Sequence, residues 1–142
     1  MNDIAKILPS GRTLSAAMAL LACALFAHPA MAGPGDAAAG KKVFKACAAC
    51  HAIGPDAANR VGPQLNGLIG RHAGTAPDYD YSAAMKNSGI TWDEQTFARY
   101  IQSPRAMVPG TKMTFAGLKK PGDIANVLAY IESFDAGGAN AH

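Results

Sequence analysis

The chain has 142 residues, 49% of them hydrophobic, a length and composition that fit a single globular domain. Its 13 basic and 10 acidic side chains give a formal net charge of +3. Because no basic run interleaved with aromatic residues occurs, the sequence argues against a nucleic-acid binder.

The first 32 residues have the pattern of a cleaved secretory signal peptide. Lys6 and Arg12 precede a nearly continuous apolar stretch at 14–27, and Ala30-Met31-Ala32 fits a cleavage site. The apolar stretch is shorter than the about 20 residues of a membrane span, so a retained anchor is the weaker alternative. We expect cleavage after Ala32, export to the periplasm and a mature domain at 33–142, with a net charge of +2 once the leader is lost.

A first helix is predicted from Asp36, which can cap it, through Phe44 towards Cys47. Directly after it stands Cys47-Ala48-Ala49-Cys50-His51. This spacing is typical of covalent attachment of a c-type haem: the two thiols form thioethers with the haem vinyl groups, and the histidine is placed under the iron as proximal ligand.

The paired cysteines also allow a zinc site or a redox-active dithiol. A structural zinc site needs four ligands, but the only other cysteine, Cys23, lies inside the predicted leader. A thioredoxin-like dithiol follows a strand, whereas residues 40–49 have a helical composition. Haem attachment is therefore the favoured interpretation, with the other two as alternatives.

The remaining elements are helices separated by long loops. Residues 52–81 and 103–111 are dense in Gly, Pro and Asn and are predicted loops. A capping-box pattern at Thr91–Glu94 predicts a helix to about Gln102. Another helix follows Pro121, with an apolar stripe formed by Ile124, Val127, Leu128 and Ile131. No strand pattern occurs, so we expect an all-α domain whose long loops wrap a cofactor.

A second iron ligand can come from few residues of the mature domain. Met113 is favoured, because Pro109-Gly110-Thr111 forms an extended turn that lets a loop carry its thioether to the iron. The alternatives are His72, His142, Met85 and Met107, with the lysine side chains as poorer candidates. Methionines often fill gaps in cores, and a terminal histidine is often disordered.

Together these segments resemble a class I cytochrome c of the bacterial cytochrome c2 and mitochondrial type. The resemblance covers the mature domain and rests on Gly40 through His51, on 61–71 and on 109–117, supported by 89–92 and the closing helix. It implies the all-α cytochrome c fold: three to five helices with long loops around one covalently bound haem c.

The resemblance also implies site residues. Met113 becomes the distal ligand opposite His51, and the Pro63 carbonyl accepts a hydrogen bond from the His51 ring. Tyr100 donates to the Met113 sulfur, and Phe115 covers the haem edge. The residues implied to contact the haem propionates are Arg71, Tyr81 and Trp92. Gly40, Phe44 and Tyr130 match the contact between the first and last helices. Met85 departs from the family, because it stands where an Asn usually joins the hydrogen-bond network near the ligand.

The implied function is electron transport in a respiratory chain, by a monomeric periplasmic carrier that is not an enzyme. Membrane redox complexes or periplasmic oxidases and reductases would dock transiently at the haem edge through Lys42, Lys45, Arg105, Lys112, Lys119 and Lys120. The alternative is a haem enzyme or gas-binding protein with an open distal site, similar to a peroxidase. It requires that Met113 not bind the iron.

Overall fold

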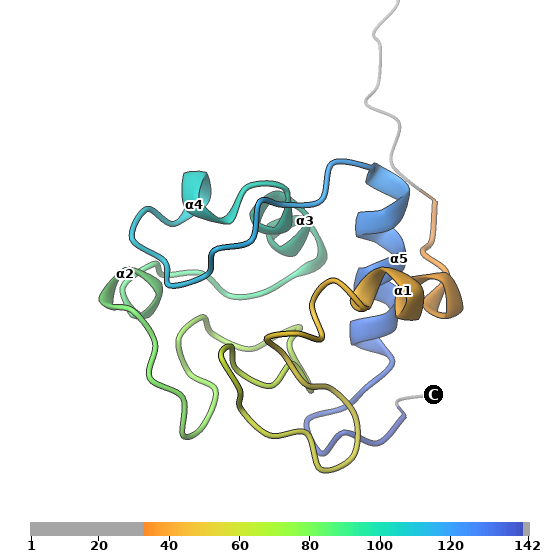
Figure 1. Ribbon diagram of the computed structural model, residues 1–142, viewed down its shortest axis with the longest axis horizontal. Helices are drawn as coiled ribbons and strands as arrows, with labels where there is room; N and C mark the ends of the chain where they lie inside the picture. Colours follow the sequence, from red (N-terminus) through yellow and green to blue (C-terminus); the bar gives the residue numbers. More distant parts are fainter. Residues whose placement is uncertain (1–32, 141–142) are drawn as a thin grey trace, which may run out of the picture.

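The computed structural model describes residues 33–140, so the predicted leader, its cleavage after Ala32 and His142 lie outside the described residues. The helices are α1 (Ala37–Phe44), α2 (Ala83–Lys86), α3 (Glu94–Gln102), α4 (Pro104–Met107) and α5 (Pro121–Glu132). Between 33 and 140 no strand forms, and only two isolated bridges occur. The predicted all-α domain of three to five helices with long loops is confirmed (Figure 1).

Helices α1 and α5 cross and hold the two ends of the domain together (Figure 1). Asp36 caps α1 as predicted, its carboxylate accepting from the Ala39 amide at 2.9 Å. A Cβ on Gly40 would lie 2.8 Å from the Tyr130 Cβ, so only glycine permits this approach. Four residues on, Phe44 packs against Tyr130 with ring centroids 5.3 Å apart.

The core is built from the inner faces of α3 and α5. The predicted stripe of α5 is buried throughout, with Val127 at 0% and Ile131 at 2% exposure. Helix α3 adds Phe97, Tyr100 and Ile101 to the same cluster. Burial of such apolar side chains is the main favourable contribution to folding, and it orients α3 with Tyr100 directed inward.

Two predicted details are wrong. Thr91 does not cap α3; Asp93 does, accepting from the Thr96 amide at 2.6 Å. The Thr91 hydroxyl is instead 2.8 Å from His72 Nδ1, across an isolated bridge. Residues 104–107, predicted as loop, form α4, because Pro104 occupies the first helical turn, where its missing N–H leaves no bond unmade.

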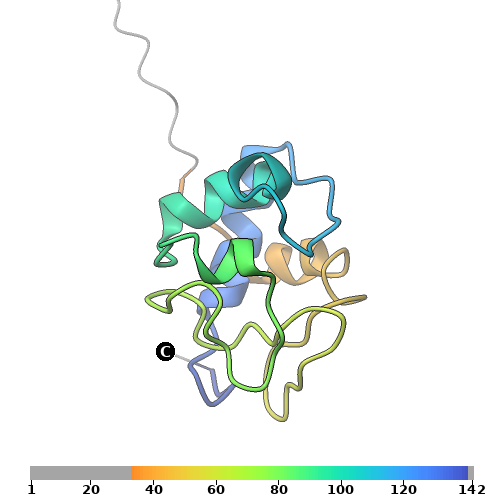
Figure 2. The ribbon, with the colours of Figure 1, turned by 90° about the vertical axis from the view of Figure 1, so that its left-hand side faces the viewer.

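The long connections enclose the other side of the molecule, where α2 faces the viewer in Figure 2. Asn66 stabilises one of them by bonding both to the Gly54 amide at 2.8 Å and to the Gly54 carbonyl at 2.9 Å. None of the helices within 33–140 has the length and apolar character that a bilayer crossing requires.

Candidate haem-binding site

The two cysteines and the histidine lie in the segment that directly follows α1. Hydrogen-bonded turns follow Phe44. The Cys47 amide donates to the Phe44 carbonyl at 2.8 Å, and the His51 amide donates to the Cys47 carbonyl at 2.9 Å. Cys47 and Cys50 are not joined by a disulfide, and both are partly buried in the wall of one cavity. Burial raises the pKa of the Cys47 thiol and neighbouring Cys50 raises it further, so this thiol is neutral before any bond forms.

The His51 ring is oriented by the loop that follows. Its Nδ1 lies 2.7 Å from the Pro63 carbonyl oxygen. Since a carbonyl can only accept, Nδ1 carries the proton and Nε2 keeps a free lone pair. Burial lowers the pKa of His51, although the Pro63 bond opposes this effect, and the neutral ring is the form that binds metal.

Gly62 lies against the face of the same ring. A Cβ on Gly62 would stand 2.7 Å from His51 Nδ1 and 2.8 Å from Nε2, too close for any side chain. The Gly62 amide also donates to the Cys50 carbonyl at 2.8 Å, which holds the loop in place. No role for Gly62 was predicted from the sequence, although it precedes Pro63 in the stretch that resembles the family.

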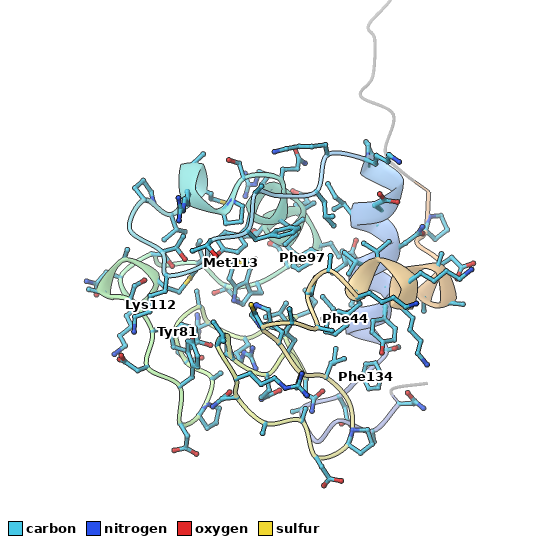
Figure 3. All side chains as sticks on the ribbon, viewed as in Figure 1. Phe44, Tyr81, Phe97, Lys112, Met113 and Phe134 are labelled. Atoms are coloured by element: carbon cyan, nitrogen blue, oxygen red, sulfur yellow. The ribbon has the colours of Figure 1, made fainter. Side chains whose placement is uncertain are left out.

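Met113 reaches the cavity from the loop between α4 and α5, as Figure 3 shows. The Tyr100 hydroxyl donates to Met113 Sδ at 3.4 Å and lies 3.3 Å from Thr111 Oγ1. Thr111 Oγ1 in turn accepts from the Met113 amide at 3.3 Å. Thr111, predicted only as part of the turn, therefore positions both the tyrosine hydroxyl and the methionine backbone through its side chain.

The other candidate ligands differ in position. Met85 is buried on α2 and lines the same cavity as Met113. Met107 lies outside the cavity lining and packs against the core from α4. His72 is exposed and bonded to Thr91, also away from the cavity.

The residues implied to contact the propionates, Arg71, Tyr81 and Trp92, all line the cavity. Arg71 donates to the carbonyls of Gln64 at 3.3 Å and Asn66 at 3.2 Å. Burial lowers the pKa of the Arg71 guanidinium and raises that of the Tyr81 phenol, although each opposes the shift of the other by its charge. A charged guanidinium in such surroundings favours an anionic partner such as a carboxylate.

Two pairs of aromatic side chains also line the cavity. Trp92 packs edge-on against Tyr100, with ring centroids 5.0 Å apart. Tyr79, for which the sequence predicted no role, packs edge-on against Tyr81 with ring centroids 4.7 Å apart, and its hydroxyl donates to the Val61 carbonyl at 2.6 Å. These contacts fix the rings that face the cavity.

All ten predicted site residues line this one cavity of about 250 Å³, which also has an apolar lining from α3 and α5. The ten are Cys47, Cys50, His51, Pro63, Arg71, Tyr81, Trp92, Tyr100, Met113 and Phe115. Two thiols, a neutral imidazole with a free nitrogen, a thioether and apolar walls are the donor set that a covalently held haem requires. The residues present therefore fit that cofactor.

Comparisons with known proteins agree with this chemistry. The cytochrome c family profile matches residues 37–135. Cytochrome c-550 of Bradyrhizobium diazoefficiens is 61% identical over 102 residues, which are 72% of this chain and 75% of that protein. Cytochrome c2 of Blastochloris viridis is 54% identical over 115 residues, covering 81% and 91%.

The fold agrees as well. The solved structure of cytochrome cH from Methylobacterium extorquens superposes with a TM-score of 0.66 at 43% identity, covering 70% of this chain and 99% of that one. Cytochrome c2 from Rhodospirillum centenum superposes with a TM-score of 0.68 at 38% identity, covering 71% and 99%. The chain belongs to the cytochrome c family, electron-transport proteins whose cofactor is a covalently bound haem c.

Proposed function

We propose that this protein is a periplasmic electron carrier whose haem is attached through Cys47 and Cys50 and whose iron is ligated by His51 and Met113. The haem supplies a one-electron couple between Fe(III) and Fe(II). The protein makes and breaks no substrate bond, and its own residues hold the two axial ligands in place.

The observation that carries the proposal is that each of the two ligand side chains has its own hydrogen-bond partner. His51 Nδ1 lies 2.7 Å from the Pro63 carbonyl, which fixes the tautomer of the ring, and the Tyr100 hydroxyl donates to Met113 Sδ at 3.4 Å. Ligands held in this way stay in place in both oxidation states, so little rearranges when an electron is transferred. Met85 has no such hydrogen bond to its sulfur within the described residues, which favours Met113 over it.

Visible spectra of the holoprotein test the ligand assignment. We expect low-spin spectra in both oxidation states, a weak methionine-to-ferric-iron absorption band, and a reduced form that resists carbon monoxide. Met113→Ala should abolish the band, whereas Met107→Ala, outside the cavity, should keep it. Ready binding of carbon monoxide by the native protein would refute the proposal and favour a peroxidase-like or gas-binding protein.

Docking is proposed to occur at exposed basic side chains, of which Lys112 lines the cavity. All six predicted docking residues are exposed: Lys42, Lys45, Arg105, Lys112, Lys119 and Lys120. Such a surface steers acidic redox partners, and salt screens that attraction. Electron transfer to an acidic partner should therefore slow as ionic strength rises, and a rate independent of salt would contradict this docking mode.

The periplasmic location rests on the predicted leader. Expression with residues 1–32 in a Gram-negative host should give a secreted holoprotein whose amino terminus is Gly33. A protein that retains the leader and fractionates with membranes would contradict cleavage after Ala32.

A further inference from the structure

A single acidic side chain makes both ion pairs found in residues 33–140. Asp80 Oδ2 lies 2.7 Å from Lys112 Nζ, and Oδ1 lies 3.7 Å from Lys86 Nζ. Lys112 Nζ also donates to the backbone carbonyl of Asp80 at 2.7 Å. One ammonium group thus binds one residue twice, which fixes the relative position of the two segments better than a lone surface pair would.

The contact joins two loops that are 32 residues apart in sequence. Asp80 precedes Tyr81 and Lys112 precedes Met113, and Tyr81, Lys112 and Met113 all line the cavity. Figure 3 shows Lys112 and Tyr81 on the side of the molecule where α2 lies, at the edge of the region that Met113 enters. The contact between Asp80 and Lys112 therefore ties together two segments that both line the cavity.

Among residues 33–140, few other hydrogen bonds connect the loop at 109–113 to the rest of the domain. Its internal bonds are local: the Thr111 amide donates to the Val108 carbonyl at 3.0 Å, and the Met113 amide to Thr111 Oγ1. Tyr100 holds the loop from inside the cavity through Thr111 and the Met113 sulfur. Lys112 is its attachment on the outer side.

We propose that Asp80 is a positioning residue for Met113: by binding Lys112 it keeps the loop at 109–113 closed over the cavity. The inference rests on the proposed function, in which Met113 ligates the iron. Hydrogen bonding and charge from Lys112, together with the charge of Lys86, lower the pKa of Asp80, so its carboxylate is ionised at neutral pH. Because the carboxylate is 85% exposed, the contact is of modest strength and controls how often the loop opens rather than whether the protein folds.

Ligand exchange on the ferric holoprotein measures loop opening directly. Imidazole, which is uncharged above neutral pH, can bind the iron only after the Met113 sulfur has left, so at saturating imidazole the rate of exchange reports opening. The substitution Asp80→Asn should raise this rate about two- to five-fold, the range expected for loss of an exposed ion pair. The decay of the methionine-to-iron band follows the reaction.

Asp78→Asn is the matched control. Asp78 lies two residues away in the same loop, forms no ion pair in residues 33–140, and has a φ of 55° that Asn tolerates. It changes the net charge equally without touching Lys112, so its exchange rate should equal that of the native protein. Equal acceleration by both substitutions would show a general charge effect and overturn the inference.

A double-mutant cycle with Lys112→Gln separates the contact from other effects. Lys112→Gln should accelerate exchange at least as much as Asp80→Asn, and the double variant should match Lys112→Gln alone. Additive effects would overturn the inference. Amide hydrogen exchange of Met113 gives a second readout, and it should be faster in Asp80→Asn than in Asp78→Asn.

The two proposals fail in different ways. If the native ferric protein lacks the methionine-to-iron band, the assignment of Met113 as ligand is wrong and the role of Asp80 falls with it. If the band is present and Asp80→Asn exchanges at the native rate, only the role of Asp80 is wrong.

Discussion

Replacing Gly62 by alanine should displace the proximal histidine. An added Cβ would lie 2.7 Å from His51 Nδ1 and 2.8 Å from Nε2. The ring Cε1 would be closer still. Ordinary van der Waals contact begins near 3.4 Å, so the ring or the loop must move by more than about 0.7 Å. The ring cannot move freely, because its Nδ1 is bonded to the Pro63 carbonyl at 2.7 Å and its backbone follows Cys50 directly.

The expected destabilisation is the sum of three contributions. Overpacking a well-filled site costs about 1–3 kcal/mol. Weakening the bond between His51 and Pro63 adds about 1 kcal/mol. Gly62 is not among the glycines with positive φ, so alanine fits its backbone conformation. Alanine also restricts the unfolded chain, which offsets the loss of stability by about 0.4–1 kcal/mol. The net loss is about 1–3.6 kcal/mol in the free energy of unfolding.

Guanidinium unfolding of the holoprotein measures this loss. With a slope of about 3 kcal/mol per M for a domain of this size, the midpoint should fall by about 0.3–1.2 M. Gly122→Ala, in the first turn of α5, is the control, because a Cβ there meets nothing within 4 Å and the midpoint should stay level or rise. If Gly62→Ala were as stable as this control, with an unshifted NMR signal of the His51 Nδ1 proton, the packing argument would be wrong.

Three further substitutions test other contacts. Tyr100→Phe removes the hydroxyl that donates to Met113 Sδ, so the sulfur gives more electron density to Fe(III) and the midpoint potential should fall by about 40 mV, the equivalent of one hydrogen bond, in a spectroelectrochemical titration. Gly40→Ala forces its Cβ against Tyr130 and the Asn126 carbonyl, and separation of α1 from α5 should lower the unfolding free energy of the holoprotein by about 2 kcal/mol. Ile131→Ala empties a site of 2% exposure, so the same denaturation should show a loss of about 3 kcal/mol.

Each of these has an outcome that contradicts it. An unchanged potential in Tyr100→Phe would mean that the hydroxyl does not act on the sulfur. A Gly40→Ala protein as stable as Gly122→Ala would mean that α1 and α5 can separate without loss. If Ile131→Ala retained the native midpoint, neighbouring side chains would have to fill the space that it leaves.

The haem chemistry could be predicted from sequence because its main parts are contiguous or rare. Two cysteines and a histidine within five residues carry the attachment signal without any knowledge of the fold. Helix α5 could be predicted because its apolar residues recur with the helical period and Pro121 marks its start. Both patterns depend only on residues that are close together in the sequence, so they can be recognised without knowledge of the tertiary contacts.

The cap of α3 was predicted wrongly because two residues could serve. Thr91 and Asp93 both have side chains that cap helices, and the local pattern at 91–94 favours the first. In the fold, Thr91 is bonded to His72 across a bridge between distant segments, which leaves Asp93 to cap. A competition between nearby residues was thus settled by a partner 19 residues away.

By itself, then, the sequence determined the cofactor class, the all-helical organisation and the residue types able to ligate the iron. Only the tertiary structure decided how those residues are held: the pressing of Gly62 on the His51 ring, the bond from Tyr100 to Met113, and the bridge from Asp80 to Lys112. The physical reason is the distance along the chain between the residues that interact. Attachment chemistry depends on neighbours along the chain, whereas orientation depends on contacts between segments that meet only when the loops close around the cavity.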